Sequence, residues 1–164
     1  MNSNVPEEYG RVLDFIESSK IQAKVRVLAP ESTRTSKAAS EVLGCSVAEI
    51  AKTIGFLTAE HNPVLVILSG DKRVDVSKLE EELTSRRMGA LRKMSAEEVK
   101  SRTGYSIGGV PPFPHRDGIL LLADDSLFRF EKVWAAAGNA NSVMQISPAV
   151  LKDNLNYRVV NVSE

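Results

Sequence analysis

Residues 103–113 read Thr-Gly-Tyr-Ser-Ile-Gly-Gly-Val-Pro-Pro-Phe, which places three glycines and two prolines just ahead of the apolar run of residues 119–123. Glycine allows a positive φ or a close backbone approach, whereas proline fixes φ and removes a donor. A loop of this composition is stiff and presents backbone amides and carbonyls in fixed directions. From these residues alone, a stiff connection is favoured over a binding site.

Helix signals recur on both sides of this loop. The apolar spacing of residues 7–20 predicts an amphipathic helix within residues 1–22. Thr35 and Gly44 are typical of the start and end of a second helix. Ser147-Pro148 predicts a short last helix. Three Ser-x-x-Glu patterns predict further helix starts at Ser46, Ser77 and Ser95. The helix that starts at Ser95 is expected to end at Gly104.

The runs between these helices are rich in β-formers. Residues 53–59 and 64–69 predict a hairpin, and the continuously apolar residues 119–123 predict a central strand. The other predicted strands are residues 24–29, 91–94, 133–137, 143–146 and 157–162. Hairpins and helical crossovers together predict a mixed α/β fold, with a barrel-like β-sheet surrounded by helices, in a single domain of residues 1–164.

The amino-acid composition narrows the possible partners and the cellular location of the protein. Of 164 residues, 43% are hydrophobic and 26% charged, and 21 basic residues balance 21 acidic ones. This balance argues against a histone-like, wholly electrostatic nucleic-acid binder, so DNA is not an expected partner. Cys45 is the only cysteine, which fits a reducing compartment. The apolar runs are too short to cross a bilayer and the N-terminus lacks the pattern of a signal peptide, so a cytoplasmic location without a membrane partner is expected.

Several common chemistries have no matching motif. The chain lacks the P-loop, dinucleotide-binding and nucleophile-elbow patterns. Neither His61 nor His115 has a second ligand at metal spacing, and no partner base accompanies Cys45. Asp124 and Asp125 are adjacent on a strand and point to opposite faces. No metal or other cofactor is expected.

Lys52 stands in Ile50-Ala51-Lys52-Thr53-Ile54, where a short helix passes into a strand. A solvated surface lysine is the default interpretation at such a position. A lysine just before a buried strand can instead point into a cleft and bind a phosphate as a point charge. The residues themselves leave both interpretations open.

The order of several segments resembles the YbaK/EbsC family of aminoacyl-tRNA deacylases, which also occur as the inserted editing domain of bacterial prolyl-tRNA synthetases. The resemblance covers an editing core of about residues 33–151, and the Thr-Gly-Tyr-x-x-Gly-Gly-Val-x-Pro run is its most specific part. The other matching stretches are residues 35–44, 50–54, 73–79, 95–102 and 137–139.

The resemblance implies the fold of that family and a set of site residues. Catalytic positions correspond to Lys52, Gly108 and Gly109. Substrate-binding positions correspond to Thr53, Val110, Pro112, Ala137, Gly138 and Asn139. It also implies hydrolysis by an ordered water or with help from the free ribose hydroxyl, because no side chain in these segments is an evident general base.

The implied function is trans-editing, that is, hydrolysis of the ester of a mischarged tRNA. The resemblance suggests tRNA(Pro) that carries a small amino acid such as alanine or cysteine, with a prolyl-tRNA synthetase as a further partner. The chain has Ala137-Gly138 where cysteine-specific relatives commonly have Ser-Gly, and it lacks their acidic residue between Asn139 and Ile146. This departure leaves alanine or another small amino acid open.

Two other classes of function remain. A non-catalytic tRNA- or synthetase-binding module would retain the basic residues and tolerate loss of Lys52, and a small-molecule regulator would use the same pocket without tRNA. The densest positive cluster, a candidate tRNA contact or simply a solvated helix face, comprises Arg86, Arg87, Arg92, Lys93, Lys100 and Arg102.

Overall fold

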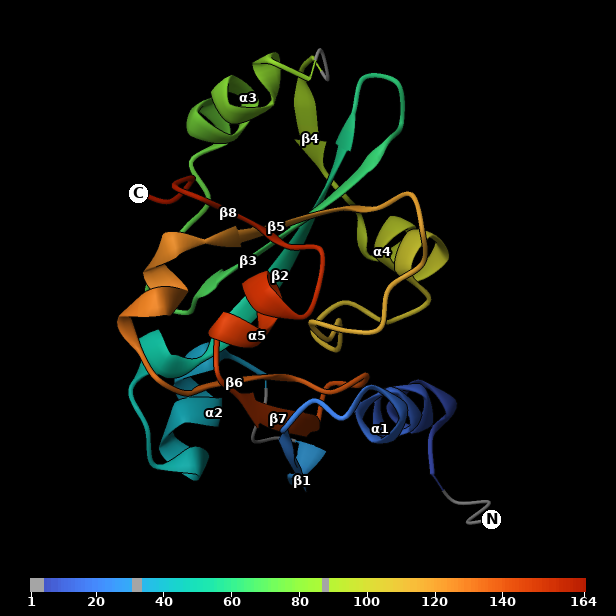
Figure 1. The fold of residues 1–164 in the computed structure, drawn as a ribbon, viewed down its shortest axis with the longest axis vertical. Helices are drawn as coiled ribbons and strands as arrows, with labels where there is room; N and C mark the ends of the chain where they lie inside the picture. The colour runs from blue at the N-terminus through green and yellow to red at the C-terminus, as the bar shows by residue number, and fades with distance from the viewer. Residues whose placement is uncertain (1–4, 31–33, 87–88) are drawn as a thin grey trace.

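The computed structural model describes residues 5–30, 34–86 and 89–164 and contains two β-sheets with helices packed around them (Figure 1). Its helices are α1 (Glu7–Ser19), α2 (Ser36–Leu43), α3 (Val76–Thr84), α4 (Ala96–Thr103) and α5 (Ala149–Asp153), with 3₁₀ turns η2 (Val47–Glu49) and η3 (Asp125–Arg129). Its strands are β1 (Lys24–Val27), β2 (Ala51–Thr58), β3 (Pro63–Ser69), β4 (Leu91–Lys93), β5 (Leu120–Asp124), β6 (Val133–Ala136), β7 (Ser142–Ile146) and β8 (Arg158–Val160).

The larger sheet has the strand order β4-β2-β3-β5-β8. Strands β2 and β3 form the expected antiparallel hairpin, whereas β3, β5 and β8 run parallel. Every residue of β3 is buried, because Val64 and Val66 pack with Leu79 of α3 on one face while Leu65 and Ile67 join the main core on the other. Burial on both faces explains why β3 is continuously apolar.

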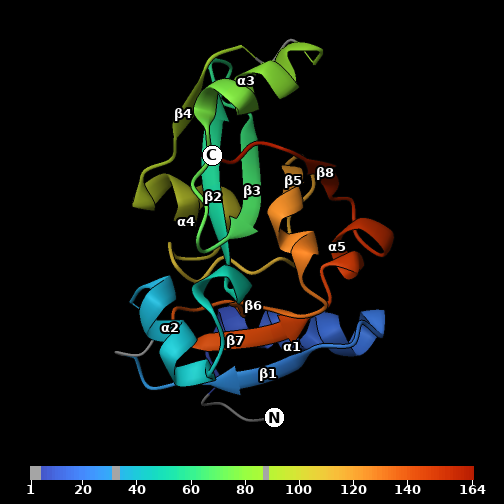
Figure 2. The same cartoon turned by 90° about the vertical axis from the view of Figure 1, so that its left-hand side faces the viewer.

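The smaller sheet has the order β1-β7-β6 and is antiparallel throughout. It lies across one end of the larger sheet, as Figure 2 shows. An isolated parallel bridge between Ile50 and Trp134 joins the end of η2 to β6 at this junction. The predicted mixed α/β fold is confirmed, although the described strands form two sheets and not one closed barrel.

Most helix ends lie where their sequence signals predict them. Thr35 Oγ1 accepts the Ala38 amide at 3.0 Å, and Gly44 ends α2 with a φ of 69°. The Ser46 and Ser95 capping boxes both form. The predicted helix start at Ser77 is wrong, because Asp75 caps α3 by accepting the Lys78 amide at 3.2 Å. Of the described helices, none is sufficiently long and apolar to cross a membrane.

Candidate active site

A cavity of about 260 Å³ opens between the two sheets. The start of β2, the loop after α4, the start of α2 and strand β6 each form part of its wall. Lys52, Thr53, Gly108 and Val110 line it together, so four of the predicted site residues meet here. The rest of the described lining consists of Arg34, Thr35, Ser36, Ala39, Leu43, Ile50, Ala51, Ile54, Ile107, Trp134, Ala135, Ala136, Ala140 and Val143.

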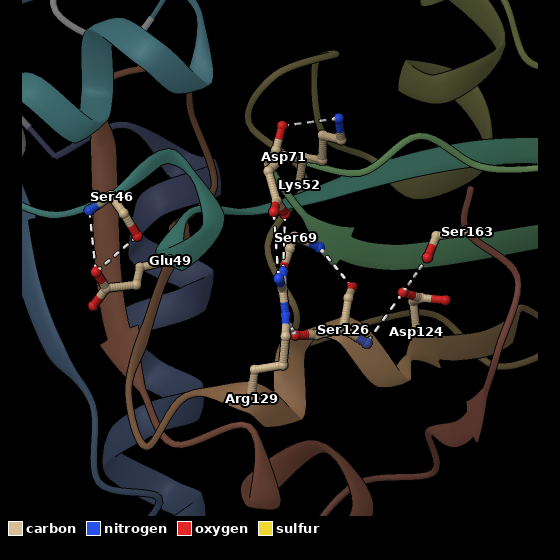
Figure 3. A network of polar contacts seen from close by, with 10 residues as sticks. Ser46, Glu49, Lys52, Ser69, Asp71, Asp124, Ser126, Arg129 and Ser163 are labelled. Carbon is tan, nitrogen blue, oxygen red and sulfur yellow. Dashed lines mark hydrogen bonds and ion pairs between the residues drawn. The ribbon is translucent and has the colours of Figure 1, made fainter.

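Lys52 is half-buried in this wall (Figure 3). Its Nζ donates a hydrogen bond to the carbonyl oxygen of Gly70 at 3.4 Å. Burial lowers the pKa of Lys52, the positive charges of Arg73 and Lys93 lower it further, and the Asp71 carboxylate opposes these effects. An ammonium group with few partners and incomplete hydration is suited to bind an anionic group of a ligand.

The glycine-rich loop places its two central glycines differently. Gly108 is exposed on the cavity, with a φ of 83° and open space where a Cβ would lie. Gly109 is buried, and its amide donates to the Ser106 carbonyl at 2.9 Å. A Cβ at Gly109 would lie 2.7 Å from the Cα of Asn139, so the loop packs directly on that backbone. Gly108 therefore faces the cavity, whereas Gly109 packs the loop against Asn139.

Residues 137–139 lie behind the cavity wall and are not among its described lining. The side chain of Asn139 accepts the amides of Asn141 and Ser142 at 3.1 and 2.8 Å, which builds the turn between β6 and β7. A Cβ at Gly138 would lie 2.5 Å from the Glu8 carbonyl oxygen, so α1 packs closely on this turn. The segment thus supports the wall that Ala135, Ala136 and Ala140 form.

Pro112 also lies away from Lys52. It is buried, and its carbonyl accepts the Tyr157 hydroxyl at 2.7 Å. It lines a second cavity of about 280 Å³ together with His115 and Tyr157. The structure therefore gives Pro112 a role in fixing the far end of the loop.

Helix α2 and Trp134 supply lining residues that the sequence did not single out. Ala39 and Leu43 of α2 contribute apolar surface, and the buried Trp134 ring has the Arg26 guanidinium 5.9 Å from its centre. The apolar stripe of α2 predicted only a packed helix face, because no local pattern distinguishes a core contact from a pocket wall.

Ionisable side chains other than lysine and arginine are absent from the described lining of this cavity. His115 lies elsewhere, where burial lowers its pKa to about 4 although its Nε2 contacts the Pro111 carbonyl at 2.7 Å. His61 occupies the exposed β2–β3 turn with a φ of 65°. Across the described residues, no three His, Cys, Asp or Glu side chains are grouped for metal binding.

The basic cluster around α4 is largely engaged by protein groups. Both terminal nitrogens of Arg92 donate to Glu98, at 2.8 and 2.7 Å. Lys100 pairs with Glu8 at 2.9 Å, and Arg102 donates to the His61 carbonyl at 2.6 Å. Arg87 lies outside the described residues. Arg92, Lys100 and Arg102 of this cluster are therefore occupied by groups of the protein itself.

Comparison with known proteins places this geometry in a family. The pattern of the aminoacyl-tRNA editing domain matches residues 30–153. The chain is 33% identical to the multifunctional Ser/Thr-tRNA deacylase ProXp-y of Escherichia coli (strain K12) over 124 residues, which are 71% of this chain and 70% of that protein. It is 32% identical to YwhH of Bacillus subtilis (strain 168), an uncharacterized protein, over 122 residues, which are 74% of this chain and 75% of that protein.

A solved structure agrees over nearly the whole chain. The crystal structure of a candidate trans-editing enzyme for prolyl tRNA synthetase superimposes with a TM-score of 0.87 and 30% identity, covering 98% of this chain and 99% of that one. The resemblance found in the sequence is confirmed, and so is the activity class, a hydrolase of aminoacyl-tRNA esters. The chain belongs to the aminoacyl-tRNA editing domain family.

Proposed function

We propose that the chain is a trans-editing deacylase that hydrolyses the ester of tRNA(Pro) carrying a small amino acid, in the cavity between the two sheets. One observation carries this proposal: Lys52 and Thr53 of β2 face Gly108 and Val110 of the glycine-rich loop across a single cavity. We further propose a cytoplasmic site of action, a prolyl-tRNA synthetase as partner, and an editing core of residues 33–151 that follows the N-terminal helix region, residues 1–22.

The cavity favours a small substrate moiety. Its volume of about 260 Å³ lies below the ~300–1,000 Å³ typical of pockets for drug-sized ligands. It holds one small amino acid and part of the terminal ribose, so the rest of the tRNA stays outside. The apolar wall of Ala39, Leu43 and Val143 fits a short side chain such as that of alanine or cysteine. Serine and threonine join these candidates because ProXp-y is named for them.

Each residue then has a distinct task. The ammonium group of Lys52 binds the phosphate or ribose of the terminal adenosine. The exposed backbone of Gly108 positions the aminoacyl group, and Gly109 holds that backbone against Asn139. Thr53 and Val110 complete the binding surface. Pro112, Ala137, Gly138 and Asn139 support the wall from behind.

The attacking group is an ordered water or the adjacent free ribose hydroxyl. This assignment is supported by the lining, because the described residues there offer neither a carboxylate nor an imidazole as general base. Hydrolysis adds water across the ester, which releases the free amino acid and an uncharged tRNA. Catalysis then rests on positioning and electrostatic stabilisation.

The test follows ester loss from tRNA(Pro) charged in turn with alanine, cysteine, serine, threonine or proline. We expect turnover of one or more small amino acids, and Lys52→Ala should reduce it by about 10²-fold. Lys152→Ala, a change at an exposed lysine of α5, is the matched control and should leave turnover unchanged. Binding of tRNA without loss of any ester would favour the alternative, a non-catalytic tRNA- or synthetase-binding module.

A further inference from the structure

The turn after β3 meets the start of β2 in very close contact. The Gly70 amide donates to the Ile50 carbonyl at 2.6 Å. A Cβ at Gly70 would lie 2.6 Å from the Val47 carbonyl oxygen and 3.2 Å from that of Ile50, so a larger residue does not fit. The Gly70 carbonyl in turn accepts the Nζ of Lys52. The position of this turn therefore determines the position of the Gly70 carbonyl oxygen that accepts the hydrogen bond from Lys52.

An ion pair fixes the same turn from its other side. The Asp71 carboxylate accepts both terminal nitrogens of Arg129, at 2.9 and 3.3 Å. Arg129 also donates from Nε to the Ser126 carbonyl at 2.7 Å, which holds its guanidinium against η3. The Ser69 amide donates to Ser126 Oγ at 3.3 Å. Figure 3 shows Asp71 and Arg129 directed toward each other beside Lys52.

The 3₁₀ turn that carries Arg129 is itself firmly anchored. Asp124 is fully buried and caps η3 by accepting the Ser126 amide at 3.1 Å. Its two oxygens also accept the Val162 amide and the Ser163 hydroxyl, each at 2.9 Å. Figure 3 shows the contact between Asp124 and Ser163. Hydrogen bonds thus lead from the C-terminal segment through η3 to Ser69 and Asp71, the two residues that flank Gly70, whose carbonyl accepts Lys52.

The charges support the same arrangement. Asp71 is the one negative charge among the groups that shift the pKa of Lys52, and it acts against burial, Arg73 and Lys93. Arg129 lowers the pKa of Asp71 through their hydrogen bond, so the carboxylate stays ionised. Arg129 also holds both carboxylate oxygens of Asp71 by hydrogen bonds.

The ion pair contributes little to folding. The side chains of Arg129 and Asp71 are 41% and 37% exposed. Ion pairs at such exposure add little to the free energy of unfolding, because water screens them. Substitution of either residue should leave the protein folded, and any effect on turnover then reports on the site.

We propose that Asp71 and Arg129 are positioning residues of the deacylation site. Together they keep the Gly70 carbonyl oxygen and the Asp71 carboxylate in place, and these two groups orient the Lys52 ammonium toward the substrate. This inference rests on the proposed role of Lys52 in binding the tRNA end. Neither residue touches the substrate, and both act through the lysine.

The experiment compares the pH dependence of kcat/KM for Asp71→Asn and Arg129→Ala. Both should lose about 10- to 100-fold, the size of effect expected when a binding group is misplaced by about 1 Å. The loss of activity at alkaline pH should move to lower pH in Asp71→Asn, because Lys52 loses its counter-charge. It should move to higher pH in Arg129→Ala, because the freed carboxylate then pairs with Lys52. Arg129→Lys should restore part of the activity.

The pair Glu82–Arg158 provides the matched control, with a contact of 3.1 Å and side chains 31% and 48% exposed. Glu82→Gln should leave kcat/KM and its pH dependence unchanged. The positioning role would be overturned if the alkaline loss of activity moved in the same direction in Asp71→Asn and Arg129→Ala. It would also be overturned if Glu82→Gln lost as much kcat/KM as these two variants.

Failure of this inference is distinguishable from failure of the proposed function. If Lys52→Ala abolishes turnover while Asp71→Asn behaves as the wild type, the positioning role alone is wrong. If Lys52→Ala retains turnover, the proposed site is wrong. In that case an NMR titration of the Lys52 Cε resonance still tests the electrostatic part: an unchanged pKa in Asp71→Asn would overturn it, and a lowered pKa would support it.

Discussion

The carbonyl oxygen of Gly109 accepts the amide of Gly138 at 3.1 Å, which joins the glycine-rich loop to the turn between β6 and β7. This bond ties the loop that leads from α4 into β5 of the larger sheet to a turn of the smaller sheet. Both glycines are buried and both lie against backbone atoms of another segment. The two sides of the cavity are therefore held together by main-chain contacts that tolerate no side chain.

Gly109→Ala should destabilise the protein by roughly 1–3 kcal/mol, because the new Cβ would meet the Asn139 backbone at 2.7 Å and neither segment can easily shift. Gly108→Ala meets open space and strains only the positive φ, at a cost of about 1–2 kcal/mol. Urea unfolding of both variants measures the difference. A Gly109→Ala protein as stable as the wild type would show that the loop does not pack as described.

Lys52→Met should stabilise the fold while it removes most turnover. Burial lowers the pKa of Lys52 from 10.5, so between that lowered pKa and 10.5 the unfolded chain binds more protons. The lysine therefore costs stability at neutral pH, and this cost disappears as the pH rises through that window. Unfolding at pH 7 and at pH 10 should show a gain for Lys52→Met at the lower pH that shrinks at the higher one. A loss of stability at pH 7 would contradict this account.

His115 should make the fold sensitive to acid. Its pKa falls from 6.5 to about 4 through burial, so the unfolded chain binds more protons between those values and stability declines as the pH falls through them. The full effect is about 3 kcal/mol at 1.36 kcal/mol per pH unit. His115→Gln removes the titrating group and should show a shallower decline from pH 6.5 to 4. Identical slopes for the two proteins would exclude His115 as the cause.

Ala39→Leu should narrow the amino-acid side of the cavity. Ala39 is 7% exposed and its methyl group lines the wall, so the larger side chain occupies space that a substrate needs. We expect kcat/KM to fall by roughly 10- to 100-fold for threonine and less for alanine, because a steric difference of about one methylene group in a pocket has an effect of this size. Val42→Leu, on the exposed face of α2, is the control. Equal losses for both amino acids would show that this wall does not select by size.

The sequence anticipates the fold wherever a signal is local. The strand of residues 64–69 and the helix from Thr35 to Gly44 follow from apolar runs and from capping chemistry, and the structure contains both. The helix start near Ser77 is wrong because Asp75 satisfies the same capping rule two residues earlier, and spacing alone does not choose between them. The division into two sheets depends on distant pairs such as Lys24 with Gln145, for which no short pattern exists.

The candidate site was predicted from the sequence only in part. Lys52 and Gly108 stand in segments that resemble the family, and they meet at the cavity. Ala39 and Trp134 reach the same cavity from segments whose patterns predict ordinary core packing. Asp71 and Arg129 are 58 residues apart and meet only after folding. Convergence of this kind follows from tertiary structure, which residue spacing does not encode.

The bridge between Ile50 and Trp134 lies between two parts of the cavity lining, to which the proposed function gives separate tasks. On one side, β2 contributes the cation, and on the other, α2 and β6 contribute an apolar wall. On the proposed function, substitutions in α2 and β6 should therefore change which amino acid is accepted without displacing Lys52. An editing protein built in this way is able to diversify its substrate range through mutation of one wall while it conserves a single hydrolytic reaction.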